Sequence, residues 1–152
     1  MELYRACEAG DLAVVIERLE AGENVNEVYN TGNDFLDDGN THLMAAAMWG
    51  HIDVVKTLVD WGADLEAREM HGCTALMLAV YDTEEFYTHG IDIAKELLKR
   101  GSAWDSVNDR HETFLDFLSE EDIQMIENFI IDLECELDDA TVLDSGSDSD
   151  FY

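Results

Sequence analysis

The sequence predicts an all-α fold: a solenoid of about four helix-turn-helix repeats. Three observations lead to this prediction. Residues 39–69 contain two short helical patterns, and each of them ends at a glycine. The same pattern recurs along the chain at intervals of about 33 residues. Apolar residues within each helical pattern are spaced so that one face of the helix can be buried. In such a solenoid, each repeat packs only against its neighbours.

Residues 39–69 contain the clearest copy of the unit. Thr41 can cap a helix, because its hydroxyl can accept a hydrogen bond from an N–H group that the first turn leaves without a partner. Three consecutive alanines at 45–47 allow a neighbouring helix to approach closely. Gly50 ends this helix, since glycine adopts a left-handed conformation without a Cβ clash. A second helix follows and ends at Gly62 in the same way. Its apolar face is formed by Ile52, Val54, Val55, Leu58 and Val59.

The unit recurs on both sides of this segment. After it, four of its positions reappear in the same relative order, as Gly72, Thr74, Leu76 and Ala79. Before it, seven positions are matched by Leu3, Ala6, Gly10, Val14, Val15, Leu19 and Gly22. Thr113 and Leu115 repeat the spacing of Thr74 and Leu76 once more. A unit of about 33 residues with insertions at two places explains all of these spacings.

These residues resemble the ankyrin repeat family. The family pattern is approximately G-x-T-P-L-H-x-A-x-x-x-G-H-x-x-V-V-x-x-L-L-x-x-G-A-D. The chain matches it at Gly39, Thr41, Leu43, Ala46, Gly50, His51, Val54, Val55, Leu58, Val59, Gly62, Ala63 and Asp64. The resemblance covers roughly residues 1–131. It implies helix pairs joined by short β-turn fingers at the rim of a concave surface, and a hydrogen-bonding structural role for His51.

The chain departs from this pattern where the family has T-P-L-H. The proline is replaced by His42, Ala75 and Phe114, and the histidine by Met44, Met77 and Asp116. The chain contains no proline at all. Because proline fixes φ at the first helical position, its absence lowers the stiffness expected at the helix starts.

The predicted domain organisation is a repeat domain at 1–131 followed by an acidic tail at 132–152. The repeats are expected at approximately 2–38, 39–70, 71–109 and 110–131, with the first and last acting as caps.

The last repeat should contain an inner helix over 113–118 and an outer helix that begins near Ser119, three residues before Asp122. Leu133 and Leu137 can extend the outer helix, and disorder is expected from Asp138 onward. Trp104 occupies the position of Leu65 and Val25 in earlier repeats and is expected in the core.

The charge balance is strongly acidic. The chain has 36 Asp and Glu residues against eight Lys and Arg residues, a formal net charge of −28. The tail contains eight of the acids and no base, so residues 1–131 still carry a net charge of −20. Such a body repels nucleic acid and anionic membranes and attracts basic proteins. General solubility or adaptation to salt would also explain the acidity, but we favour a basic partner.

Two insertions supply most of the candidate binding residues, because each mixes aromatic side chains with acids. The first insertion lies within 27–38 and the second within 82–90. An aromatic anchor inside an acidic cluster suits recognition of a surface rich in Lys or Arg. The alternative is that both segments are loop tips without a binding role. Trp49 is either buried between repeats or a further anchor. The complete set is Tyr29, Asp34, Phe35, Asp37, Asp38, Trp49, Tyr81, Asp82, Glu84, Glu85, Phe86 and Tyr87.

The sequence contains no recognisable catalytic constellation, so no enzyme activity, cofactor or metal is expected. The five histidines lack the spacing of a zinc site, and no glycine-rich phosphate loop is present. The three cysteines are far apart and odd in number, which favours a reducing, cytoplasmic compartment. Cys7 is expected to fill the core. The start of the chain does not resemble a signal peptide, and no stretch is long and apolar enough for a membrane span.

We therefore expect a non-enzymatic protein–protein interaction module that binds no nucleic acid directly. Our sharper hypothesis is a highly acidic inhibitor that neutralises a basic nuclease, toxin or nucleic-acid-binding protein. An immunity or antitoxin-like protein and a viral anti-defence protein that mimics nucleic-acid charge both fit. The alternative is a scaffold or adaptor regulated by phosphorylation of its acidic tail, where residues 144–149 read DSGSDS.

Overall fold

The computed structural model describes residues 2–30, 39–81 and 87–149, with side chains for all of these except 87, 88 and 138–149. Its contacts divide the chain into two compact units, Met1–Leu118 and Ser119–Tyr152. The predicted repeat boundaries, and the predicted division at residue 131, remain predictions.

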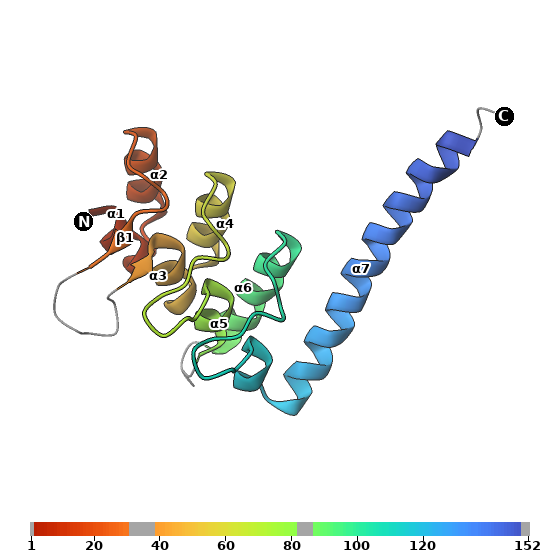
Figure 1. The fold of residues 1–152 in the computed structure, drawn as a ribbon. Helices are drawn as coiled ribbons and strands as arrows, with labels where there is room; N and C mark the ends of the chain where they lie inside the picture. The colour runs from red at the N-terminus through yellow and green to blue at the C-terminus, as the bar shows by residue number, and fades with distance from the viewer. Residues whose placement is uncertain (1, 31–38, 82–86, 150–152) are drawn as a thin grey trace. The chain divides into compact units, whose positions relative to one another are not determined.

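The first unit contains three helix pairs. They are α1 (Glu2–Ala9) with α2 (Leu12–Glu20), α3 (His42–Met48) with α4 (Ile52–Asp60), and α5 (Ala75–Val80) with α6 (Tyr87–Lys99). The helices of each pair pack together, α3 also packs on α1 and α5, and α4 packs on α2 and α6. Figure 1 shows the resulting stack, with an inner row of α1, α3 and α5 and an outer row of α2, α4 and α6. The predicted all-α solenoid is confirmed.

A short antiparallel ladder closes the base of the first finger. The strands β1 (Val28–Tyr29) and β2 (Asn40–Thr41) pair with Val28 opposite Thr41 and Tyr29 opposite Asn40. The N–H of Gly39 also donates to the carbonyl of Tyr29 over 2.9 Å. The chain therefore leaves and re-enters the stack at one place, on either side of the first insertion.

The last element of the first unit is shorter than expected. The inner helix predicted over 113–118 is a single 3-10 turn, η1 (Phe114–Phe117). The carboxylate of Asp116 accepts the N–H of Thr113 at 2.7 Å and its hydroxyl at 3.2 Å, which closes the turn on itself. Leu118 is already extended, with φ −100° and ψ 155°, so the helix cannot continue.

The second unit is built on one long helix, α7 (Glu120–Ser149). At its start the hydroxyl of Ser119 accepts the N–H of Asp122 at 3.3 Å and donates to the Asp122 carboxylate at 2.6 Å. The predicted start signal is thus confirmed. The helix continues past Asp138, the residue at which the sequence predicts the start of disorder.

The core of the stack lies between the two rows of helices. Every residue of α3 from His42 to Ala47 is buried, because this helix is covered by neighbours on several sides. Neither α3 nor α5 contains a Lys, Arg, Asp or Glu residue. Cys7 is fully buried, as predicted. The largest buried side chains include Leu3, Tyr4, Val15, Leu43, Met44, Leu58, Leu76, Met77, Ile93 and Leu97.

One side-chain contact between repeats joins His51 to the first helix pair. The ring Nε2 of His51 lies 2.8 Å from the carbonyl oxygen of Glu8, which confirms the structural role implied by the sequence. Gly10 has a φ of 72°, and a Cβ added there would lie only 2.5 Å from Nδ1 of the same ring. Glycine is therefore required at position 10 both by backbone conformation and by space.

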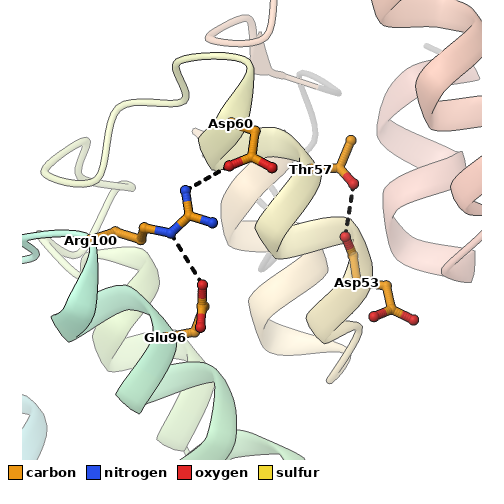
Figure 2. A network of polar contacts seen from close by, with 5 residues as sticks. All are labelled: Asp53, Thr57, Asp60, Glu96 and Arg100. Carbon is orange, nitrogen blue, oxygen red and sulfur yellow. Dashed lines mark hydrogen bonds and ion pairs between the residues drawn. The ribbon is translucent and has the colours of Figure 1, made fainter.

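Arg100 connects the outer helices of the second and third repeats (Figure 2). Its guanidinium contacts Asp60 at the end of α4 over 2.6 Å and Glu96 of α6, the helix that Arg100 follows, over 3.1 Å. The pKa of Arg100 is raised, mainly by the hydrogen bond to Asp60. Figure 2 also shows the Thr57 hydroxyl, which donates to the carbonyl of Asp53 over 2.9 Å. Because this network is exposed to solvent, it aligns the helices more than it stabilises them.

The expectation for Trp104 is wrong, because 42% of this residue is exposed. The equivalent residues, Val25 and Leu65, are themselves only half-buried. The position therefore lies at the edge of the core, and an indole there extends into solvent.

The two threonines that begin α3 and α5 differ in their hydrogen bonding. The hydroxyl oxygen of Thr41 accepts the N–H of Met44 at 3.3 Å, as the sequence predicts. The hydroxyl oxygen of Thr74 is buried and has no hydrogen-bond partner among the described residues. One hydroxyl thus caps its helix, and the other is desolvated without compensation.

Replacing each threonine with the isosteric valine should therefore have different effects. Thr41→Val should lower the free energy of unfolding by about 1 kcal/mol, because the cap is lost. Thr74→Val should leave it unchanged or raise it, because an unsatisfied buried polar atom is removed. Urea denaturation followed by circular dichroism measures both variants. Equal losses would show that the two hydroxyls do not differ in this way.

His42 is a titratable group buried in the first repeat interface. Only 3% of it is exposed, and its ring lies 6.0 Å from that of Tyr4. Burial lowers the pKa of His42, although the nearby carboxylates of Glu27 and Glu23 act in the opposite direction. The folded protein therefore favours the neutral imidazole.

Because the pKa of His42 is lower in the folded state, the unfolded chain binds more protons. The resulting stability should be fully present above about pH 6.5, the usual histidine value, and should be lost progressively below it. We expect the free energy of unfolding of the wild type to fall relative to that of His42→Phe as the pH drops from about 7.5 to 5.5. The comparison removes the contribution of the acidic residues to the pH dependence, because both proteins contain the same acids. A difference that does not change with pH would contradict this assignment.

Candidate functional site

An open depression of about 470 Å³ lies beside the first finger. It is lined by Arg5, Glu8 and Ala9 of α1, by Tyr29 of β1 and by Trp49 at the end of α3. The ring of Tyr29 is half-buried and stacks on Tyr4, with 4.1 Å between centroids and 7° between planes. Trp49 is 43% exposed. The structure thus brings together two aromatic residues that the sequence singled out in separate segments.

A second cavity, also of about 470 Å³, lies between the inner helices and the next two fingers. Its apolar wall is formed by Met48, Leu78 and Tyr81, and the buried thiol of Cys73 lies beside them. Tyr81 is 46% exposed and meets the ring of Phe117 edge to face, with 5.2 Å between centroids. The polar lining residues are Glu69, His71, Asn108, Asp109, Arg110 and Glu112.

The two fingers around this cavity are built in the same way. The Oε1 atom of Glu69 accepts the backbone N–H groups of His71 at 2.9 Å and Cys73 at 2.8 Å. The Oδ1 atom of Asn108 accepts those of Arg110 at 2.9 Å and Glu112 at 3.0 Å. Each buried side chain thereby satisfies two N–H groups that the tight turn leaves without a backbone acceptor.

Sequence reasoning missed Glu69 and Asn108, although a signal was present. Each lies five residues before the threonine that begins the next inner element, Thr74 or Thr113. The recurrence could have identified the pair as finger residues. It could not show that their side chains turn inward.

Further hydrogen bonds tie one finger to the next. The N–H of Asp109 donates to the carbonyl of His71 at 3.0 Å. The guanidinium of Arg68 donates to the carbonyl oxygens of Gly72 and Val107, which belong to successive fingers. The walls of the second cavity are therefore held in place before any partner arrives, which lowers the entropy lost on binding.

The electrostatics around Cys73 indicate where the carboxylates lie. The pKa of Cys73 is raised, first by burial and then by the negative charges of Glu69 and Glu112. A hydrogen bond from the Asn108 amide to Sγ, at 3.7 Å, acts in the opposite direction. Within the ranges that the structure describes, no three His, Cys, Asp or Glu side chains are arranged to hold a metal ion.

The structure places only part of the predicted site. Tyr29 and Trp49 meet at the depression, and Tyr81 lines the cavity. Tyr87 begins α6, but its side chain is not among those described. Eight residues in the two insertions lie outside the described residues: Asp34, Phe35, Asp37, Asp38, Asp82, Glu84, Glu85 and Phe86.

The sequence model of a known family, described as ankyrin repeats (3 copies), matches residues 3–110, which include all three helix pairs. The chain belongs to the ankyrin repeat family. Its repeats form a protein–protein interaction module, and domains of this family are generally non-enzymatic. Among the described residues, no helix has the length and apolar character needed to cross a membrane.

Two curated proteins are similar to part of this ankyrin repeat protein. Both are named ankyrin repeat and SAM domain-containing protein 6. The mouse protein (Mus musculus) is 32% identical over 102 residues and the rat protein (Rattus norvegicus) is 31% identical over 102 residues. The match covers 66% of this chain but only 10% of each relative, so the chain spans about a tenth of their length.

The three thiols should react at different rates in the folded protein. Burial, with a contribution from Glu8, raises the pKa of Cys7 to about 12, and Cys73 is also buried with a raised pKa. Cys135 is exposed. Iodoacetamide near neutral pH should therefore alkylate Cys135 first, because the thiolate is the reactive form and must also be reached. Peptide mass spectrometry measures each site, and all three should react in urea. Equal rates without urea would contradict the burial of Cys7 and Cys73.

Proposed function

We propose that this protein docks a basic protein on its inner face and thereby blocks that partner's own binding or catalytic surface. The inner face is defined here as the surface that contains the depression at Trp49 and the cavity at Tyr81. The observation that carries the proposal is the exposure of these two aromatic side chains at hollows of a chain whose net charge is −28.

The distribution of side chains supports this arrangement. The inner helices α3 and α5 lack charged residues, and Met48, Leu78 and the two aromatic residues give the inner face its apolar contact area. The acids Glu69, Asp109 and Glu112 of the fingers line the cavity, and the sequence contains further acids in its two insertions. An apolar centre with a charged rim is the usual composition of a protein interface. The rim charges would speed association with a basic partner and select against acidic ones.

The charge also determines which partners fit. A net charge of −28 opposes direct binding of nucleic acid, so the partner is a protein. A nuclease, a toxin or another nucleic-acid-binding protein has a basic cleft that acidic fingers could occupy in place of phosphates. An immunity protein, an antitoxin or a viral anti-defence protein would act in this way. A scaffold or adaptor is the competing function, and binding that is insensitive to salt would favour it.

The proposed contacts can be tested by substitution at the inner face. Trp49→Ala and Tyr81→Ala should each weaken partner binding by about tenfold or more, because exposed aromatic anchors contribute most to such interfaces. Trp61→Ala is the matched control, since Trp61 is 46% exposed but follows the outer helix α4. Isothermal titration calorimetry with a partner captured from host extract measures the affinities. A loss with Trp61→Ala alone would place the interface on the outer row.

The charge contribution is tested by salt and by charge reversal. Binding should weaken steeply as the salt concentration rises, because screening removes the attraction between exposed charges. Replacing Asp34, Asp37, Asp38, Glu84 and Glu85 with lysine should weaken it further and lower the association rate. Stopped-flow association at several salt concentrations separates the rate from the affinity. Binding that survives both changes would contradict a charge-based inhibitor.

A further inference from the structure

The cavity beside Tyr81 is lined by a buried carboxylate, that of Glu69. Only 8% of Glu69 is exposed, and its Oε1 atom accepts both finger N–H groups. The carboxylate also forms a side-chain hydrogen bond with the Cys73 thiol, and Glu69 lines the cavity. A carboxylate at the wall of a cavity favours a cationic ligand that can donate hydrogen bonds to it.

The other lining residues define the shape and charge of that donor. Glu112 and Asp109 add two more carboxyl groups, and the Oε2 atom of Glu112 is oriented by the Asn108 amide at 3.0 Å. Met48 and Leu78 form an apolar wall of the cavity, and the aromatic ring of Tyr81 is partly exposed there. A ligand that matches this site has an aliphatic stem, a planar cationic end and several N–H donors.

We propose that this cavity receives the side chain of one arginine of the protein partner. The aliphatic stem would lie along Met48 and Leu78. The guanidinium would donate to the carboxylates of Glu69 and Glu112 while stacking on Tyr81. This inference rests on the proposed function and deepens it, because it names the partner residue that enters the inner face.

Arginine fits better than the other candidates. Lysine carries a compact, strongly hydrated charge that can neither pair in two directions in one plane nor stack on the ring as well. An anionic ligand would be repelled by the carboxylates of Glu69, Asp109 and Glu112. Arg110 and His71 are the basic residues among those that line the cavity. Arg110 makes no ion pair with the described part of the chain and lies at the exposed rim. It would repel the incoming guanidinium, so its removal should strengthen binding.

The test uses the full chain labelled with ¹⁵N and three small probes. These are the N-acetyl methylamides of arginine, of lysine, and of citrulline, which has nearly the shape of arginine without the charge. Arginine should cause saturable shifts of the backbone amide signals of His71, Cys73, Arg110 and Glu112 at millimolar concentration, since these N–H groups bond to Glu69 and Asn108. Lysine should bind more weakly, and citrulline should cause no saturable shift.

Three substitutions and one control make the assignment specific. Glu69→Gln retains an acceptor for the two finger N–H groups but removes the charge, and it should weaken arginine binding by about tenfold or more. Glu112→Gln should also weaken it, and Arg110→Ala should tighten it. Asp53→Asn is the matched control, because it removes one exposed charge on the outer helix α4 and should leave the affinity unchanged.

Distinct results would overturn this inference or the proposed function. The inference fails if arginine causes no saturable shift, if citrulline binds equally well, or if Asp53→Asn matches Glu69→Gln. It also fails if a captured basic partner binds Glu69→Gln and Glu112→Gln as tightly as the wild type. In that last case the proposed function stands, because the basic partner still binds. If the arginine probe binds as expected but every captured partner is insensitive to salt, the cavity assignment stands and the charge-based inhibitor fails.

Discussion

The burial of α3 between α1 and α5 is the contact on which the rest of the stack depends. A helix of this length is too short to be stable alone in water, so its conformation comes from its neighbours. Three consecutive alanines bring those neighbours close, and Leu43 and Met44 fill the remaining space. Because α3 is so closely covered, it carries no charged residue, and neither does α5. The inner face is apolar for the same reason that the stack is stable.

The fingers form the polar walls of the second cavity, whose apolar wall comes from the inner helices. Glu69 and Asn108 each place a polar side chain inside a tight turn, and both turns then line one cavity. A residue that serves the turn with one atom can serve a ligand with another. This double use explains how a structural carboxylate can also be a binding group, and why the cavity is formed before a partner is present.

Local patterns in the sequence were sufficient for the helices but not for the site. Thr41, Gly50 and the spacing of the apolar residues predict α3 and α4, because caps, glycine conformation and helical periodicity are properties of neighbouring residues. The cavity depends on Glu69 and Asn108 turning inward from two successive fingers, which is a tertiary event. The sequence wrongly predicts a core position for Trp104. The position in the repeat indicates only that the side chain points toward the core, whereas its exposure also depends on its size.

The contact between Gly10 and His51 has an evolutionary consequence. Any side chain at position 10 would collide with the imidazole, and the left-handed backbone there already disfavours one. Removing the imidazole would relieve the collision, but the carbonyl of Glu8 would lose its partner. Residues 10 and 51 should therefore change together in evolution or not at all. A first repeat taken from another protein would need a residue at position 10 that leaves room for the imidazole of His51. Repeats can be added or exchanged only where the residues that meet between neighbouring repeats, such as these two, remain compatible.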